Sequence, residues 1–194
     1  MRCYINKSVI TCMVFFFGIL SVEPQIKKES IKNNISNSTK IPVLIIDGFS
    51  NHQWDTNTKY LRKILESTGK FKVAVSTCPN QKENKSEWEN WNPDFNTYPV
   101  VIQTCNNIFR EDSLQWPNHV KQSFEKYVDE GGGVYIYHSA ANAFKGWPAY
   151  NKMIALGWRN KDFGVAVTIN DKEELEVIAK GEGENTRHGA RTDA

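Results

Sequence analysis

Apolar and polar residues alternate along the chain in blocks that predict strands and helices in turn. Ile41–Asp47 (IPVLIID) is a continuous apolar run, which is typical of a strand buried on both faces of a sheet. Shorter apolar runs recur four times further along the chain. They predict strands at Phe71–Ser76, Tyr98–Thr104, Val134–Tyr137 and Val165–Ile169.

Two segments between these runs carry apolar residues at helical spacing. The spacing predicts a helix over Thr56–Thr68, with Asp55 or Thr56 as its capping residue. It predicts a second helix over Val120–Asp129, which three consecutive glycines end. The Trp- and Asn-rich segment Ser86–Thr97 is expected to form a loop.

The order of these elements predicts the fold class. Strand, helix, strand, strand, helix, strand is typical of a mainly parallel sheet with helices on both faces. We therefore expect an α/β fold, a three-layer α/β/α sandwich with a flavodoxin-like sheet. The chain has 194 residues, of which 40% are apolar and 24% charged, enough for one domain with a packed core. That domain is expected to span residues 41–194.

The first forty residues have a different character. Arg2 and Lys7 are followed by the apolar run Ser8–Val22, so residues 1–22 are expected to form a signal peptide for export to the periplasm or the cell exterior. The alternative is an uncleaved signal that anchors the protein, and we expect membrane contact only through this segment. Residues 23–40 are rich in Lys, Asn and Ser, which predicts a flexible linker.

The charge balance argues against nucleic acid as a partner. The chain has 24 Lys and Arg against 22 Asp and Glu. Without Arg2 and Lys7 of the expected signal peptide, the balance is 22 against 22. Proteins that bind nucleic acids usually carry a clear basic excess.

The four cysteines are too few for a disulfide scaffold. Cys78 and Cys105 are the two that fall in the expected domain, and each follows a predicted strand. If the first strand separates the second from the third, their Cα atoms lie about 9–10 Å apart. That exceeds the limit of about 7 Å for a disulfide, so we expect two free thiols.

Polar residues follow the predicted strands at the edge where parallel α/β sheets bind ligands. His52 follows the first strand, Cys105 and Asn106 the third, and His138 and Ser139 the fourth. With the strands in the order 2-1-3-4, the ends of the first, third and fourth strands are neighbours. We therefore expect these side chains to share one crevice.

His138 and His52 are the main candidates for acid–base catalysis, because histidine titrates near neutral pH. The alternatives are a structural hydrogen bond from His138 and a simply solvated His52. Ser139 is a weaker candidate nucleophile, because Tyr137 stands where a nucleophile elbow needs a small residue. Ser139 could instead cap the following helix. Cys105 paired with His138 is the least favoured nucleophile.

The sequence has no local metal-binding motif such as H-x-x-x-H. A divalent metal could still bind to His52 and His138 together with a carboxylate. No other cofactor is indicated.

Three ordered motifs give the chain a family resemblance. They are Ile45–Gly48 with Asn51–Trp54, then Phe124–Val134, then His138–Phe144 with Leu156–Trp158. Together they make residues 41–194 resemble the ThuA-like (trehalose utilisation) domains, which are similar in fold to class I glutamine amidotransferases. Those enzymes carry a nucleophilic cysteine where this chain has His138 and Ser139, so the resemblance does not imply glutaminase activity.

The resemblance implies a small carbohydrate as ligand, either a trehalose-type disaccharide or a keto-sugar. The first hypothesis is an exported sugar-processing enzyme, with its reaction open between hydrolase, lyase and isomerase. The second is a carbohydrate-binding module without catalysis. In both, aromatic faces and polar groups at the strand ends would bind the sugar. The residues expected to do so are Asn51, Trp54, Asn106, Asn142, Trp147 and His188.

The chain also departs from the family pattern. In ThuA-like domains a stretch similar to His188–Arg191 precedes a further strand, a His-Pro-Ile segment and an Asp-Glu-Leu-Tyr segment. This chain reaches Ala194 before any of these. We therefore expect the fold to be truncated at its C-terminus and to lack a catalytic or ligand carboxylate. The third hypothesis is accordingly an inactive fragment of such a domain.

Overall fold

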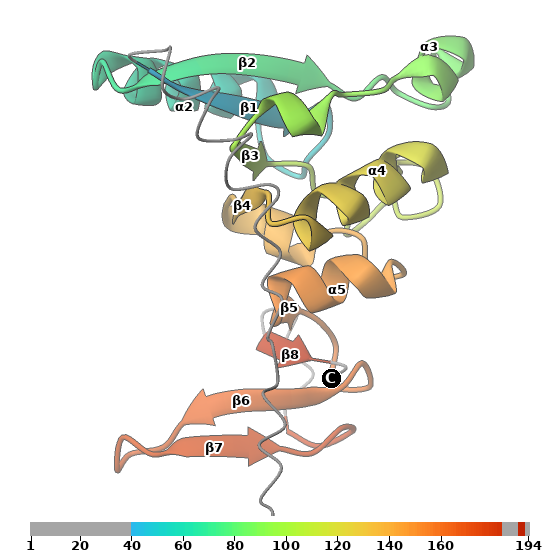
Figure 1. Ribbon diagram of the computed structural model, residues 1–194. Helices are drawn as coiled ribbons and strands as arrows, with labels where there is room; N and C mark the ends of the chain where they lie inside the picture. Colours follow the sequence, from blue (N-terminus) through green and yellow to red (C-terminus); the bar gives the residue numbers. More distant parts are fainter. Residues whose placement is uncertain (1–39, 184–189, 193–194) are drawn as a thin grey trace, which may run out of the picture.

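The computed structural model describes residues 40–183 and 190–192. The expected signal peptide, all but the last residue of the expected linker, and His188 lie outside the described residues. Figure 1 shows the elements in chain order. They are β1 (Ile41–Asp47), α2 (Trp54–Ser67), β2 (Phe71–Thr77), α3 (Lys85–Asn90), η1 (Phe95–Thr97), β3 (Val100–Gln103), α4 (Asn118–Asp129), β4 (Gly133–Ile136), η2 (His138–Asn142), α5 (Pro148–Ile154), β5 (Gly157–Trp158), β6 (Val165–Ile169), β7 (Leu175–Ile178) and β8 (Ala190–Thr192).

Four strands form a parallel sheet in the order β2-β1-β3-β4. Ile45 of β1 pairs with Val75 of β2 and with Ile102 of β3, and Ile102 also pairs with Tyr135 of β4. The α/β fold and the predicted strand order are confirmed. The carboxyl ends of β1, β3 and β4 therefore meet at one edge of the sheet.

The central strand β1 is buried on both faces, as its apolar run predicts. Val43 and Ile45 lie in a cluster that also contains Leu61 and Leu65 of α2. Leu44 and Ile46 lie in a larger cluster with α4 and α5 on the opposite face. Successive side chains of a strand point to opposite faces, so an unbroken apolar run supplies both clusters. Helices thus cover both faces of the sheet.

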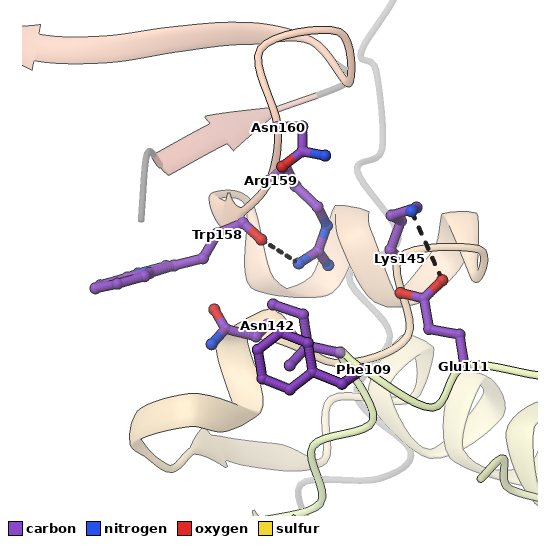
Figure 2. A pocket seen from close by; sticks show the side chains of 8 residues that line it. Phe109, Glu111, Asn142, Lys145, Trp158, Arg159 and Asn160 are labelled. Atoms are coloured by element: carbon purple, nitrogen blue, oxygen red, sulfur yellow. Dashed lines mark hydrogen bonds and ion pairs between the residues drawn. The ribbon is translucent and has the colours of Figure 1, made fainter. Parts of the chain in front are cut away.

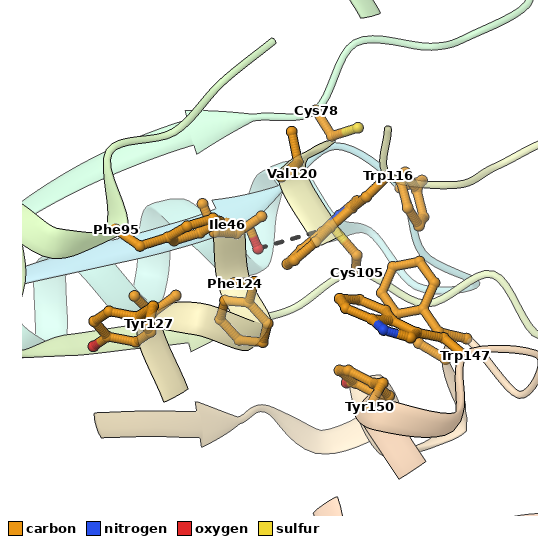
Figure 3. Close-up of a cluster of buried hydrophobic side chains, with 14 of the residues drawn as sticks. Ile46, Cys78, Phe95, Cys105, Trp116, Val120, Phe124, Tyr127, Trp147 and Tyr150 are labelled. Carbon is orange, nitrogen blue, oxygen red and sulfur yellow. Dashed lines mark hydrogen bonds between the residues drawn. The ribbon is translucent and has the colours of Figure 1, made fainter. Parts of the chain in front are cut away.

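Aromatic rings fill the larger cluster (Figure 3). The ring centroid of Trp116 lies 5.4 Å from that of Phe124, 5.3 Å from Phe144 and 5.9 Å from Trp147, all in edge-to-face orientation. Each such pair adds about 0.5–1.5 kcal/mol beyond the area it buries. This cluster therefore fixes how α4 and α5 pack on the sheet.

The structure corrects the interpretation of Trp147 as a sugar-binding ring. Trp147 is only 6% exposed, and its indole N–H donates to the Glu125 carboxylate. Its ring stacks on Tyr150 at 5.4 Å, and the Lys121 ammonium group lies 5.4 Å from the ring centroid. Because these groups pack against the ring inside the core, it presents no face to a ligand.

A second sheet is antiparallel, in the order β5-β8-β6-β7. The strand predicted at Val165–Ile169 is confirmed, but it belongs to this sheet and not to the parallel one. In Figure 1 the β6–β7 hairpin lies at the opposite end of the molecule from β1 and β2. None of the helices in the described part of the chain is long and apolar enough to cross a membrane.

Two local predictions differ from the structure. The segment expected to be a loop contains α3 and η1, and indole N–H groups attach it to the body of the protein. Trp88 donates to the Gln115 carbonyl at 2.7 Å, and Trp91 donates to Ser76 Oγ at 2.9 Å. Helix α2 begins at Trp54 after Gln53, which gives no side-chain cap, so the expected capping by Asp55 or Thr56 is wrong.

Candidate functional site

His52 and His138 lie beside each other at the carboxyl edge of the parallel sheet. Their ring centroids are 5.0 Å apart and their planes differ by 34°. His52 belongs to the loop after β1, and His138 begins η2 directly after β4. Both side chains are exposed. The strand order therefore brings together two imidazoles that are 86 residues apart in the sequence.

The loop that carries His52 depends on a close backbone approach. Gly48 has φ +129°, and a Cβ there would collide with the backbone of Cys78. The Cys78 N–H donates to the Asp47 carbonyl at 2.8 Å across the same junction. Only glycine allows this close packing where β1 ends, and the junction sets the course of the chain toward His52.

His138 has a left-handed backbone conformation, with φ +47°. A residue with a Cβ in this region costs of order 1–3 kcal/mol, and such residues cluster at functional sites. The turn from β4 into η2 thus presents the imidazole to solvent at a conformational cost. This backbone feature is a reason, independent of residue type, to regard His138 as functional.

Hydroxyl and amide groups connect the loops around the two histidines. Ser50 Oγ lies 3.5 Å from Ser139 Oγ and accepts a hydrogen bond from the His52 backbone N–H at 3.2 Å. Asn106 donates from Nδ2 to Asn51 Oδ1 at 2.7 Å. The loops after β1, β3 and β4 are therefore joined side chain to side chain, which supports the shared crevice expected from the sequence.

The two candidate nucleophiles are poorly activated. Ser139 is buried and its hydroxyl lies within hydrogen-bond distance of the Ser50 hydroxyl, which is not a general base at neutral pH. Burial raises the pKa of the Cys105 thiol well above its ordinary value. Burial likewise raises the pKa of Cys78 to about 12. Both cysteines are free, as the strand order predicts, but they are held as neutral thiols.

The histidine pair offers two of the ligands that a metal ion would need. Among the described residues no group of three or more His, Cys, Asp or Glu side chains is arranged to hold a metal ion. Catalytic zinc sites usually use three protein ligands. A cation at His52 and His138 would therefore need to draw its remaining ligands from water or substrate.

Asp47 is a carboxylate near this edge that sequence reasoning did not single out. It ends β1, is buried, and its Oδ1 has no hydrogen-bond partner within the described residues. Burial raises the pKa of this carboxyl, although the Thr58 and Thr77 hydroxyls lower it in part. The one feature of the sequence that could have identified Asp47 is its place as a single acidic residue at the end of the apolar run IPVLIID.

Four of the expected sugar-binding residues line three separate hollows and not one. Asn51 and Asn106 line a pocket of about 350 Å³ with Ser50. Trp54 lines another of about 390 Å³ beside Cys78. Asn142 lines a third of about 210 Å³, whose aromatic residues the sequence reasoning missed because they follow no strand of the parallel sheet.

Comparison with known proteins gives one informative likeness. No family model matches the chain, and no curated protein matches it significantly. The chain is similar to the 1.75 Å crystal structure of a protein from Parabacteroides merdae ATCC 43184 described as ThuA-like. The two are 34% identical with a TM-score of 0.62, over 72% of this chain and 47% of that one. The chain thus spans about half the length of that protein.

The likeness agrees with the motifs and with the fold. An identity of 34% together with a shared fold supports a common family, because the alignment extends over most of this chain. The α/β arrangement with a parallel β2-β1-β3-β4 sheet agrees with this likeness in fold. The chain is therefore similar in sequence and in fold to a ThuA-like protein, over about half of that protein's length.

Proposed function

We propose that this protein binds a small carbohydrate, a trehalose-type disaccharide or a keto-sugar, at the carboxyl edge of its parallel sheet. The observation that carries the proposal is the 5.0 Å approach of the His52 and His138 rings at that edge. The ThuA-like relationship supplies the class of ligand. Hydroxyl and amide groups of Ser50, Asn51 and Asn106 beside the rings suit the hydroxyl groups of a sugar.

The histidine pair supports proton transfer as the chemistry. In this proposal a neutral imidazole accepts a proton from the substrate while the second, protonated imidazole donates one to the departing or enolising oxygen. The pair then holds the same number of protons before and after the step. General acid–base catalysis by such groups accounts for about 10²–10⁴-fold in rate per group. Which of the two imidazoles acts as the acid depends on the orientation of the bound sugar.

The proposal includes export, directed by residues 1–22, and a class I glutamine amidotransferase-like fold. It does not include glutaminase activity. The turn after β4 carries His138 and Ser139 where that chemistry needs an activated cysteine, and the nearest buried thiol, Cys105, is held neutral.

A carbohydrate-binding module without catalysis is the second candidate function. The exposure of both imidazoles favours it, because catalytic histidines are more often enclosed in a site that excludes water. This candidate shares the ligand and the location with the first. It differs only in predicting binding without turnover.

The test uses His138→Gln and His52→Gln, with His119→Gln as the matched control. His119 lies on α4, contacts the Trp91 carbonyl, and is not among the residues that line the hollow of Ser50 and Asn51. We expect His138→Gln to weaken binding of trehalose by tenfold or more and His52→Gln by less, measured by calorimetry. If the protein is an enzyme, release of reducing sugar should fall about 10²–10⁴-fold.

Two results would contradict the proposal. One is unchanged trehalose and keto-sugar binding in both variants, which would place the site elsewhere. The other is equal loss in the His119→Gln control. Binding that depends on His138 without any turnover would select the binding module.

A further inference from the structure

A second pocket lies between the β3–α4 loop and residues of the segment 142–160 (Figure 2). We call it the Trp158 pocket. It has a volume of about 210 Å³, smaller than the roughly 300–1,000 Å³ of pockets for drug-sized ligands. The residues that line it include Phe109, Glu111, Asn142, Lys145 and Trp158.

Two aromatic rings from distant parts of the chain line this pocket. Trp158 of β5 is 41% exposed, and Phe109 of the β3–α4 loop is 64% exposed. Aromatic faces carry partial negative charge and attract the weakly positive C–H groups on the flat face of a sugar ring. Two partly exposed rings at one pocket therefore suit a ligand that has an apolar face.

Polar groups occupy the rest of the pocket lining. The carboxamide of Asn142 extends toward the side of the pocket on which the Trp158 ring lies (Figure 2). Its Oδ1 is buried and accepts no hydrogen bond from any described residue. Lys145 Nζ lies 3.8 Å from the Glu111 carboxylate, so one wall has both donors and an acceptor. Such a set matches a ring whose edge carries hydroxyl groups.

Arg159 holds the floor of the pocket in place. Its guanidinium group donates to the Ala141 and Ala143 carbonyls at 3.0 and 2.9 Å and to Asn151 Oδ1 at 2.7 Å. The Arg159 side chain is buried, and these bonds fix η2 against α5 and β5. The positions of Asn142 and Trp158 are therefore set by a rigid support, which reduces the entropy lost when a ligand binds.

The Trp158 pocket adjoins a hollow formed partly by the loop that carries His52. Ile108 and Phe109 line both the Trp158 pocket and the neighbouring hollow that contains Ser50 and Asn51. The Ile108 N–H donates to Asn106 Oδ1, whose amide in turn contacts the loop of His52. Two adjacent hollows that share a wall can receive two linked rings.

We propose that the Trp158 pocket is a second sugar subsite, which binds a ring covalently linked to the ring held at the histidine pair. This inference rests on the proposed function and adds that the preferred ligand has at least two sugar rings. Trp158 and Phe109 contact the apolar face of the outer ring, and Asn142 with the Glu111–Lys145 pair binds its hydroxyl groups. The small volume of the pocket fits one ring, not two.

The experiment compares trehalose with glucose as probes, using the full chain and calorimetry. We expect wild type to bind trehalose more tightly than glucose. Trp158→Ala should weaken trehalose binding about tenfold, the loss expected for one aromatic contact, and change glucose binding less than twofold. Trp158→Phe should retain most of the trehalose affinity. Tyr60→Ala, which removes an exposed aromatic side chain from α2, is the matched control.

The outcomes separate this inference from the proposed function. If His138→Gln weakens binding but Trp158→Ala leaves the preference for trehalose intact, the second subsite is overturned and the proposed function stands. If Trp158→Ala abolishes trehalose binding and His138→Gln has no effect on it, the histidine site is overturned. The proposal that one ligand occupies both the histidine site and the Trp158 pocket is then overturned as well. If neither sugar binds wild type, the second subsite is overturned and the proposed function is confined to a keto-sugar. Unchanged glucose binding by Trp158→Ala shows that this variant is folded.

Discussion

The two sheets of this protein obtain their stability in different ways. In the parallel sheet, Val43 to Ile46 of β1 are all buried, and helices cover both faces. In the antiparallel sheet, Ile169, Leu175 and Val177 of the β6–β7 hairpin are exposed, Leu175 at 71%. The hairpin is held mainly by its ladder of backbone hydrogen bonds. An apolar strand composition therefore does not by itself indicate a core strand.

The two proposed binding surfaces also differ in the sheet that supports them. The histidine pair stands on loops of the parallel sheet, whose ends are fixed by the core. The Trp158 pocket combines the loop after β3 with β5 of the antiparallel sheet. A variant in one region can therefore be tested for its effect on the stability or binding of the other region.

The largest expected effect is in the aromatic core. Phe124 is fully buried and packs on Trp116, Phe95 and Tyr127. Phe124→Ala should lower the free energy of unfolding by about 3–5 kcal/mol, because a large cavity remains. Urea denaturation followed by circular dichroism measures this change. A loss below about 1 kcal/mol would show that the core is not the main source of stability.

The next effect concerns the connection between the two regions. Arg159→Met keeps the apolar stem but removes the donors that bind the Ala141 and Ala143 carbonyls and Asn151. We expect a loss of about 2–3 kcal/mol, because buried acceptors are left unsatisfied. Hydrogen exchange should quicken in β5 and β6 more than in β1. Arg62→Met, which breaks only an exposed ion pair on α2, should cost less than about 0.5 kcal/mol.

Asp47 gives a smaller, pH-dependent effect. Its carboxyl pKa is raised by burial, so the folded state favours the neutral form. Its contribution to stability is therefore present below the unfolded-state pKa and is lost as pH rises through the raised folded-state pKa. Asp47→Asn, neutral at every pH, should become increasingly stable relative to wild type as pH rises above the unfolded-state pKa of the carboxyl. Thermal unfolding across this range measures the difference.

The control for Asp47 is an acid with the opposite shift. The Thr56 backbone N–H lowers the pKa of Asp55 at the start of α2, so this exposed carboxylate stabilises the fold above its unfolded-state pKa. Asp55→Asn should be slightly less stable than wild type at neutral pH and equal to it in acid. Shifts of the same sign in both variants would contradict the assigned environments.

The smallest effect is expected on the exposed face of the hairpin. Val177 of β7 is 60% exposed, so Val177→Ser removes little buried apolar surface. We expect a change within about 0.5 kcal/mol in the free energy of unfolding. A larger loss, measured by the same urea titration as for Phe124→Ala, would show that another surface covers this face in solution.

The sequence predicts those parts of the structure that follow from local pattern. The run IPVLIID identifies a strand buried on both faces, and the strand order places His52 near His138. Trp147 could not be placed in this way, because an aromatic residue before a proline fits equally well at a surface or in a core. Only the tertiary packing of Tyr150 and Lys121 on its ring decides between them.

The Trp158 pocket was likewise beyond the reach of sequence pattern. Phe109 and Trp158 are about fifty residues apart in a chain of 194, and neither stands at the end of a parallel strand. Their meeting depends on the way Arg159 anchors η2 to β5. Buried side chain–backbone hydrogen bonds of this kind have no periodic signature.

The left-handed backbone of His138 has a consequence for how this position evolves. Glycine adopts φ +47° without steric cost, so His138→Gly would relieve backbone strain while it removes the imidazole. Selection for stability alone would therefore replace this histidine, whereas selection for activity would retain it. A library screened only for heat resistance should accumulate glycine at position 138, and a library screened for sugar binding should reject it.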